Sequence, residues 1–284
     1  MVKKRKTTKK QRSKNKDRIL NVIPSPDTEK DWLYSHAEEA GIIRGPATAL
    51  PTSKDLRQKW WDIRNQGGTG ACVGFATADS VLRWQFAQAG KLGKTSTSDR
   101  DKLSPRFTWM SSKETDHYTS YPTTMIERTG TWLKAALEVS RKFGAVRESD
   151  LQFQPEKLWD GSQSGFFSNA AQFKIRSYYN LSHRLLQSWP GTLRKWRRWI
   201  ANIGPILTRL DVDDTWNNVT ANGKLNTYKP NTTRGGHAVA LVGYTRDRFI
   251  VRNSWGLTWG DKGYGYASLA YTKAAFTEAY GVKI

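Results

Sequence analysis

One short segment constrains this chain more than any other. Residues 66–76 contain the only cysteine among 284 residues, Cys72, directly after a glycine-rich turn. The glycines permit positive φ angles, so the backbone can turn sharply into the apolar run that follows. From Cys72 to Ala87 apolar side chains recur at helical spacing, which predicts a helix beginning at the cysteine. A thiol there faces unpaired backbone N–H groups and the positive end of the helix dipole, which favours thiolate. Taken alone, such a cysteine also fits an inert, buried apolar residue.

Two segments far downstream favour the reactive interpretation. Residues 235–244 predict a strand entered at His237, with small residues before it that leave the imidazole accessible. Residues 252–256 follow a second predicted strand and present Asn253 beside Trp255. A thiol, an imidazole and an amide in this order can form a nucleophile, its base and an orienting group, although they lie far apart in sequence.

Three sequence motifs occur in a fixed order along the chain, and together they are more specific than any one of them. They are Gln-x-Gly…Gly-x-Cys-x-x-Phe-Ala, Gly-His-Ala-Val and Asn-Ser-Trp-Gly-x-x-Trp-Gly-x-x-Gly-Tyr. Over residues 50–284 this pattern resembles the papain-like cysteine peptidases, in a disulfide-free variant. The resemblance implies an α+β fold with a helical lobe, an antiparallel β-barrel-like lobe and an active site in the cleft between them. It further implies a thiol protease that cleaves polypeptides without a cofactor or a metal.

The resemblance also assigns roles to individual residues. Cys72 is the expected nucleophile, His237 its base and acid, and Asn253 the group that orients the imidazole. Gln66 is expected to form an oxyanion hole with the backbone N–H of Cys72. The chain departs from the family at Val73, where a tryptophan is usual. Its Cys72–His237 separation exceeds the roughly 130–150 residues typical of the family, which predicts an insertion.

Five residues are expected to line the substrate cleft. Gly130 and Thr131 stand where the family borders the cleft with a glycine-containing stretch, although an ordinary helix-capping turn explains them equally. Arg209 falls near the floor of the second specificity pocket and predicts tolerance of an acidic or polar substrate side chain there. The other two residues are Gly236 and Trp255. Trp255 is also expected to shield the His–Asn hydrogen bond from water.

Charge is unevenly distributed along the chain. The net charge is +21, and residues 1–18 contain ten Lys/Arg and one acidic residue. A charge run without aromatic residues is typical of disorder. A solvated tail, an arm that binds nucleic acid or another acidic surface, and a nuclear address in a eukaryotic host all remain open. The alternative function is therefore a nucleic-acid-associated protein tethered by this tail, with an auxiliary or inactive peptidase body.

The sequence predicts three regions: a basic disordered tail at 1–18, a strap or short pro-like segment at 19–49, and the peptidase domain at 50–284. The strap is shorter than the inhibitory segment of many relatives, so it either covers part of the cleft or merely packs on the body. A single cysteine excludes intramolecular disulfides, and we expect an intracellular, reducing location such as the cytoplasm. No apolar run reaches the roughly 20 residues of a membrane span. The oligomeric state stays open.

Overall fold

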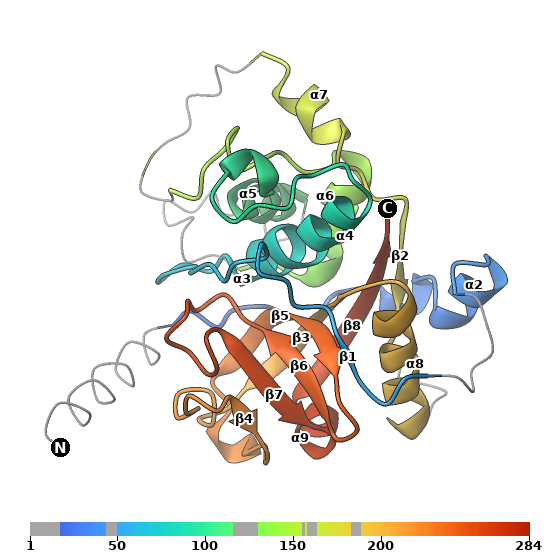
Figure 1. The fold of residues 1–284 in the computed structure, drawn as a ribbon, viewed down its shortest axis with the longest axis vertical. Helices are drawn as coiled ribbons and strands as arrows, with labels where there is room; N and C mark the ends of the chain where they lie inside the picture. The colour runs from blue at the N-terminus through green and yellow to red at the C-terminus, as the bar shows by residue number, and fades with distance from the viewer. Residues whose placement is uncertain (1–17, 44–49, 116–129, 155–156, 158–163, 183–188) are drawn as a thin grey trace, which may run out of the picture.

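The computed structural model describes residues 18–43, 50–115, 130–154, 157, 164–182 and 189–284. Helices form one lobe and a sheet forms the other, with the N-terminal strap running between them before it reaches α2 (Figure 1). The predicted α+β, two-lobe fold is confirmed. The predicted tail lies outside the described residues except for Arg18, as do residues 44–49 of the strap.

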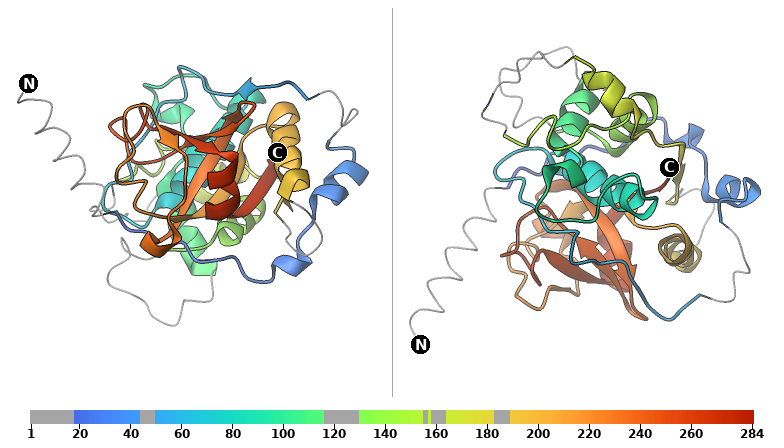
Figure 2. Two further views of the ribbon diagram at one scale, coloured as in Figure 1. Left: turned by 90° about the horizontal axis from the view of Figure 1, so that it is seen from below. Right: turned by 45° about the horizontal axis from the view of Figure 1, so that its top comes forward.

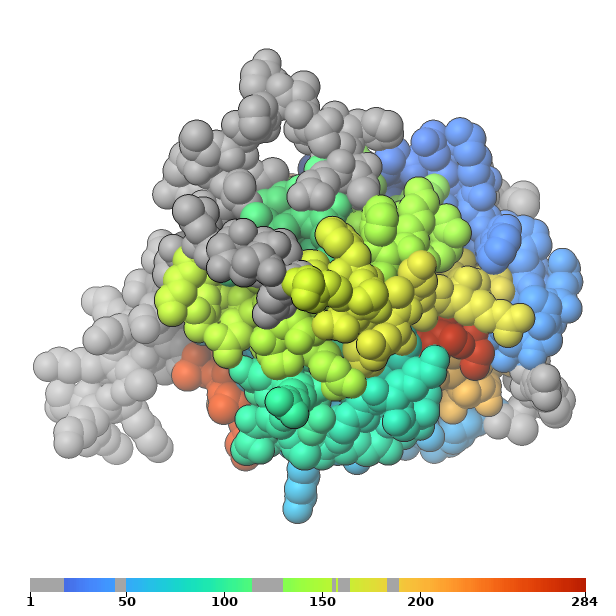
Figure 3. Space-filling view, turned by 90° about the horizontal axis from the view of Figure 1, so that it is seen from above, coloured from blue at the N-terminus to red at the C-terminus, as the bar shows by residue number. Residues whose placement is uncertain are grey.

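The helical lobe is built around the helix that begins at the single cysteine. Its elements are α3 (Cys72–Gly74), the π-helical segment η2 (Phe75–Leu82), α4 (Arg83–Gln88), η3 (Asp99–Asp101), α5 (Pro105–Thr115), α6 (Leu133–Lys142) and α7 (Phe166–Ala171). The first three form one continuous helix, as the apolar periodicity predicts. All residues of η2 are buried, because this helix lies between the other helices and the sheet. Figure 3 shows the outer face of this lobe from above, with the strap at its flank.

The second lobe contains one sheet with strand order β2-β8-β3-β5-β6-β7-β4, and β1 pairs with β5. The strands are β1 (Lys54–Asp55), β2 (Ser177–Asn180), β3 (Ile206–Val212), β4 (Lys224–Leu225), β5 (Gly235–Tyr244), β6 (Arg248–Arg252), β7 (Tyr264–Ser268) and β8 (Phe276–Lys283). All neighbours are antiparallel except β4 and β7, which are parallel. The sheet is open, so the expected barrel-like lobe is not closed.

Helices and aromatic side chains cover the sheet. The helices of this lobe are α8 (Trp189–Asn202) and α9 (Leu269–Ala275), with the short turn η6 (Pro230–Thr232) before β5. Figure 2 shows α8 and α9 beside the strands from two further directions. The apolar face of α8 is buried on the sheet, and Trp196 and Trp199 are fully inaccessible. No helix in the described ranges is long and apolar enough to cross a membrane.

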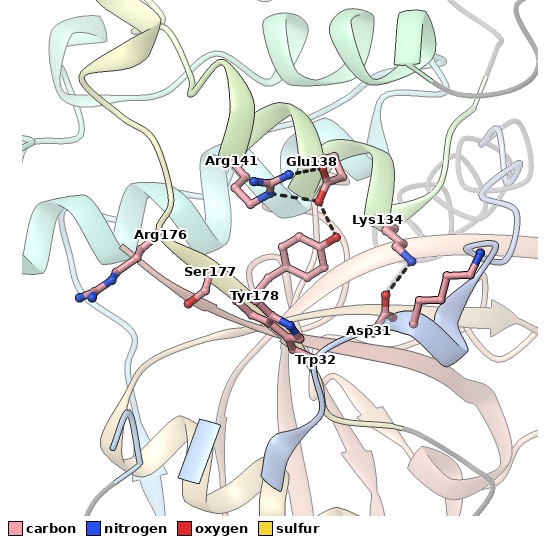
Figure 4. A pocket seen from close by; sticks show the side chains of 9 residues that line it. Asp31, Trp32, Lys134, Glu138, Arg141, Arg176, Ser177 and Tyr178 are labelled. Carbon is pink, nitrogen blue, oxygen red and sulfur yellow. Dashed lines mark hydrogen bonds and ion pairs between the residues drawn. The ribbon is translucent and has the colours of Figure 1, made fainter. Parts of the chain in front are cut away.

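The strap is fixed to the body at a buried carboxylate. It contains η1 (Thr28–Lys30) and α2 (Tyr34–Glu39), and Asp31 lies between them. The Asp31 carboxylate accepts hydrogen bonds from Asn180 Nδ2 at 3.0 Å and Tyr280 Oη at 2.9 Å. It also pairs with Lys134 Nζ at 2.7 Å, at the edge of a cavity of about 340 Å³ between the strap, α6 and β2 (Figure 4). The strap therefore packs on both lobes.

Candidate active site

The nucleophile helix and strand β5 meet at the thiol. Cys72 begins α3 and is fully buried. Its sulfur accepts the backbone N–H of Ala238, the residue that follows His237 on β5. Burial raises the pKa of Cys72 to about 11, and the hydrogen bond from Ala238 opposes that rise. The fold thus brings the two predicted reacting residues, distant in sequence, to one place between the lobes.

The imidazole of His237 is held by the predicted amide. His237 Nε2 lies 2.8 Å from Asn253 Oδ1. That oxygen also accepts the backbone N–H of Ser254 at 2.8 Å, which identifies it as the carbonyl oxygen of the amide. Because a carbonyl oxygen only accepts, Nε2 carries the proton. The other nitrogen, Nδ1, is buried without a hydrogen-bond partner in the described part of the chain, so its lone pair is unused.

The same burial sets the protonation states. Burial lowers the pKa of His237 to about 4, the hydrogen bond to Asn253 opposes this, and the charge of Arg18 lowers it further. With the pKa of Cys72 raised to about 11, the thiol and the imidazole are both neutral at neutral pH. An ion pair requires the thiol to lose its proton more readily than the imidazolium does.

Gln66 is fixed between the nucleophile turn and the Asn253 loop. Its backbone N–H donates to Ser254 O at 2.8 Å, and its Oε1 accepts Ser254 Oγ at 2.6 Å. Its Nε2 donates to Thr69 O at 2.8 Å. An amide nitrogen has two hydrogens, so this contact leaves one N–H available. The side chain is fully buried, which fixes its orientation.

Two indoles pack on the histidine, and a third packs on both of them. The ring centroids of Trp255 and His237 are 5.0 Å apart. Trp216 packs on His237 edge-on at 5.6 Å, and Trp259 packs on Trp216 at 4.7 Å. Sequence reasoning did not identify Trp216. It lies in the loop after β3, and nothing in its local pattern distinguishes it from the chain's twelve other tryptophans.

The strap occupies the space beside these groups. Val22 N donates to Gly236 O at 3.2 Å, and Asn21 forms a parallel bridge with Gly236. A Cβ at Gly236 would collide with the Val22 carbonyl oxygen, and a Cβ at Gly130 would collide with Asn21. Only glycines allow the strap this close on both sides. Two of the predicted cleft residues, Gly130 and Gly236, therefore face each other across the strap.

Arg18 contacts the segments that carry the predicted catalytic groups. Its Nη1 donates to Asn65 Oδ1 at 3.0 Å and to Gly67 O, and its Nη2 lies 3.4 Å from Trp255 O. Its guanidinium stacks over the Trp255 ring at 5.7 Å. Burial lowers the pKa of Arg18. The sequence contained no signal for this contact, because Arg18 appeared as the last member of a charge run.

The two remaining cleft residues differ in position. Arg209 Nε donates to Val22 O at 3.2 Å, while its other nitrogens contact Thr277 Oγ1 at 2.7 Å and Asp211 Oδ1 at 2.9 Å. Arg209 thus lies under the strap and contacts its main chain. Thr131 is fully buried, and its hydroxyl lies 3.4 Å from Ser112 O on α5. Its side chain therefore packs toward the helices.

A buried ion network joins the segments that carry the predicted catalytic residues. We define it as Asp62, Arg64, Asp79, Arg83, Glu148 and Arg252. Asp79, on the nucleophile helix, contacts Arg252 at 3.0 Å, Arg83 at 3.3 Å and Arg64 at 3.5 Å. Burial alone would raise the pKa of Asp79, but these three charges hold it below its usual value. Arg252 immediately precedes Asn253, and Arg64 lies two residues before Gln66, so the network supports both segments.

The site offers nothing that would hold a metal in the parts described. No group of three or more His, Cys, Asp or Glu side chains suited to a metal occurs among those residues. The titratable groups at the centre are one thiol and one imidazole, supported by two amides. These are groups for nucleophilic acyl chemistry.

Comparison with known proteins gives the same assignment. The sequence is 26% identical to cathepsin K of Mus musculus over 265 residues, covering 89% of this chain and 68% of that protein. It is 28% identical to peptidase 1 of Dermatophagoides pteronyssinus, covering 88% and 71%. The fold is similar to that of xylellain, a cysteine protease from Xylella fastidiosa, with a TM-score of 0.72 at 20% identity over 94% of this chain and 96% of that one. The sequence model of the papain family cysteine proteases matches residues 50–278, so the chain belongs to that family.

Proposed function

We propose that this cysteine peptidase hydrolyses peptide bonds through an acyl-enzyme on Cys72. His237 Nδ1 takes the thiol proton, and the thiolate sulfur bonds to the carbonyl carbon of the substrate. The C–N bond breaks as the imidazolium gives its proton to the departing amine. Water then attacks the thioester, His237 takes a proton from it, and the sulfur leaves as thiolate. The observation that carries this proposal is the Nε2–Asn253 hydrogen bond, since it leaves the Nδ1 lone pair for the thiol.

Asn253 suits this role because it is neutral. It fixes the imidazole plane and the tautomer without discharging the thiolate–imidazolium pair that the first step creates. The remaining Nε2–H of Gln66 and the backbone N–H of Cys72 are the proposed donors to the oxyanion. Removing one such donor costs about 2.7–4 kcal/mol of barrier in other hydrolases.

The test uses the fact that the chain has one cysteine. A thiol-directed epoxide should add one equivalent to the full-length chain carrying Arg18→Ala, which removes a contact that covers the site, with mass spectrometry placing it on Cys72. His237→Ala should label at least tenfold more slowly, because the thiol loses its base. Equal labelling rates at neutral pH in both proteins would refute the assignment of His237.

We further propose that residues 19–49 act as a pro-like strap that keeps this protein latent. The strap covers three of the predicted cleft residues, Gly130, Arg209 and Gly236, and Arg18, the residue just before it, contacts a fourth, Trp255. Cys72 and His237 are both fully inaccessible beneath it. Removal of the strap would readmit water, which lowers the pKa of the thiol and raises that of the imidazole. These are the directions that an ion pair requires.

Arg18→Ala should loosen the strap and raise the rate of peptide hydrolysis at least fivefold in the full-length chain. Lys14→Ala, which removes one charge from the same basic run, is the matched control and should change the rate by less than twofold. If both variants hydrolyse peptides at the wild-type rate, the strap does not limit access to the thiol.

A second candidate function follows from the ten basic residues at positions 1–18. We propose that this segment tethers the peptidase to nucleic acid. Binding to a 20-base-pair DNA should then weaken steeply with salt, with a logarithmic slope of about −0.9 per phosphate contacted. Removing residues 2–17 should abolish that slope. Salt-independent binding, or an unchanged slope after the deletion, would exclude this tether.

A further inference from the structure

The fully buried indole of Trp216 contacts the catalytic histidine that the proposed mechanism requires to hold its direction. The rings of Trp216 and His237 are nearly perpendicular, at 83°, and the ring of Trp255 lies at 39° to the imidazole. The imidazole is therefore packed against two large rigid side chains. Its hydrogen bond to Asn253 fixes one ring nitrogen. Rotation that would move Nδ1 must displace an indole.

Trp216 is itself held in one orientation. Its Nε1–H donates to Tyr271 Oη at 2.9 Å, and Tyr271 Oη donates to Asp213 Oδ1 at 2.7 Å. A tyrosine hydroxyl has a single hydrogen. Because Tyr271 donates that hydrogen to the Asp213 carboxylate, a lone pair of its hydroxyl oxygen accepts the indole N–H of Trp216. The backbone carbonyl of Trp216 also accepts Trp259 Nε1–H at 3.0 Å.

The end of this chain of hydrogen bonds is a carboxylate that the proposed mechanism does not use. Asp213 is fully buried. It accepts Thr215 Oγ1 at 2.5 Å and the backbone N–H of Lys229 at 2.6 Å besides Tyr271. No cation forms an ion pair with it within the described ranges. Burying a carboxylate costs free energy that neutral donors only partly offset, so a hydrophobic residue would serve packing better. A carboxylate does impose a direction on the tyrosine hydroxyl.

We propose that Trp216, oriented through Tyr271 by Asp213, is a positioning residue that keeps the imidazole of His237 directed at Cys72. This inference rests on the proposed peptidase mechanism. Trp216 takes no part in the reaction itself. It acts by restricting the rotation of the His237 imidazole. Loss of the Trp216 indole lowers the fraction of molecules in which His237 Nδ1 can take the thiol proton. That change lowers kcat and leaves KM nearly constant.

The test compares Trp216→Ala with Trp216→Phe in the full-length chain carrying Arg18→Ala. Trp216→Ala should lower kcat at least tenfold with KM within twofold of its parent. Trp216→Phe retains a flat ring and should recover kcat to within threefold. Tyr271→Phe, which keeps the indole but removes its hydrogen-bond acceptor, should lower kcat three- to tenfold. Tyr178→Phe, which removes the hydrogen bond from Tyr178 on the distant strand β2 to Glu138 on α6, is the matched control and should leave kcat unchanged.

A second measurement does not depend on turnover. The His237 Nε2–H hydrogen-bonded to Asn253 should give a slowly exchanging imidazole signal in the NMR spectrum of the full-length chain. Its exchange with water should be at least tenfold faster in Trp216→Ala, or in Tyr271→Phe if the alanine variant does not fold. Unchanged exchange in both variants would overturn the positioning role. A parent that never hydrolyses peptide would instead overturn the proposed function and leave this measurement to decide the role of Trp216.

Discussion

The two lobes hold the proposed catalytic residues by different means. Around Cys72, the nucleophile helix is fixed by the buried ion network centred on Asp79. Around His237, the sheet lobe uses three indoles and hydrogen bonds from neutral groups. Charged contacts connect the helix to segments from elsewhere in the chain, while rings fill the volume around one side chain. The comparison predicts that the nucleophile side is sensitive to loss of a charge and the histidine side to a change of volume.

The largest effect is expected at the centre of the network. Asp79→Asn leaves the buried Arg83 and Arg252 and the partly buried Arg64 with one carboxylate fewer, and removing one partner of a buried ion pair costs about 3–5 kcal/mol. Urea unfolding should show this loss in the free energy of unfolding. A loss below 1 kcal/mol would mean that the network contributes little to holding the nucleophile helix.

The next effect concerns the histidine side and depends on pH. The pKa of His237 is about 4 in the folded chain against 6.5 for a free histidine. Between these values the unfolded chain binds a proton that the folded chain does not. The free energy of unfolding should therefore fall as the pH drops from 6.5 to 4, by about 3 kcal/mol in total. Unfolding of the wild type and His237→Gln at several pH values isolates this contribution, and parallel curves would contradict it.

A smaller effect tests the volume sensitivity of the sheet lobe. A Cβ at Gly281 on β8 would overlap the indole of Trp199 on α8. Gly281→Ala should therefore lower the free energy of unfolding by about 1–3 kcal/mol, as overpacking does. Gly68→Ala is the control, since no described atom lies within 4 Å of the position of its Cβ. Equal stability of the two variants would show that the sheet lobe adapts to added volume.

The smallest effect is expected where a charge is exposed. Glu138 pairs with Arg141 at 2.8 Å, and the two side chains are 26% and 44% exposed. Glu138→Gln should cost less than about 1 kcal/mol, with a smaller cost at high salt. A loss as large as that of Asp79→Asn would show that burial does not decide what a charge contributes in this protein.

The sequence was most informative where short-range spacing carries the signal. The helix at Cys72, the strand at His237 and the family of the chain follow from periodicity and from three local motifs. The ion network around Asp79 was not predicted, because tertiary contacts between residues distant in sequence leave no periodicity.

Contacts that depend on the path of loops and termini could not be predicted. Trp216 reaches His237 from the loop after β3, and Arg18 reaches Trp255 across almost the whole chain. The pairing at the edge of the open sheet was equally out of reach. There the short strand β4, which comes from an irregular segment, pairs with β7 in parallel. In each case the partner is selected by packing in three dimensions.

Peptide hydrolysis by two full-length proteins tests the central claim most directly. Arg18→Ala and Arg18→Ala/Cys72→Ala differ by a single sulfur atom at the proposed reaction centre. The account predicts that the first cleaves a peptide substrate and that the second cleaves it at least a thousandfold more slowly. Equal rates from the two proteins would contradict it, because no other cysteine in the chain could supply the nucleophile.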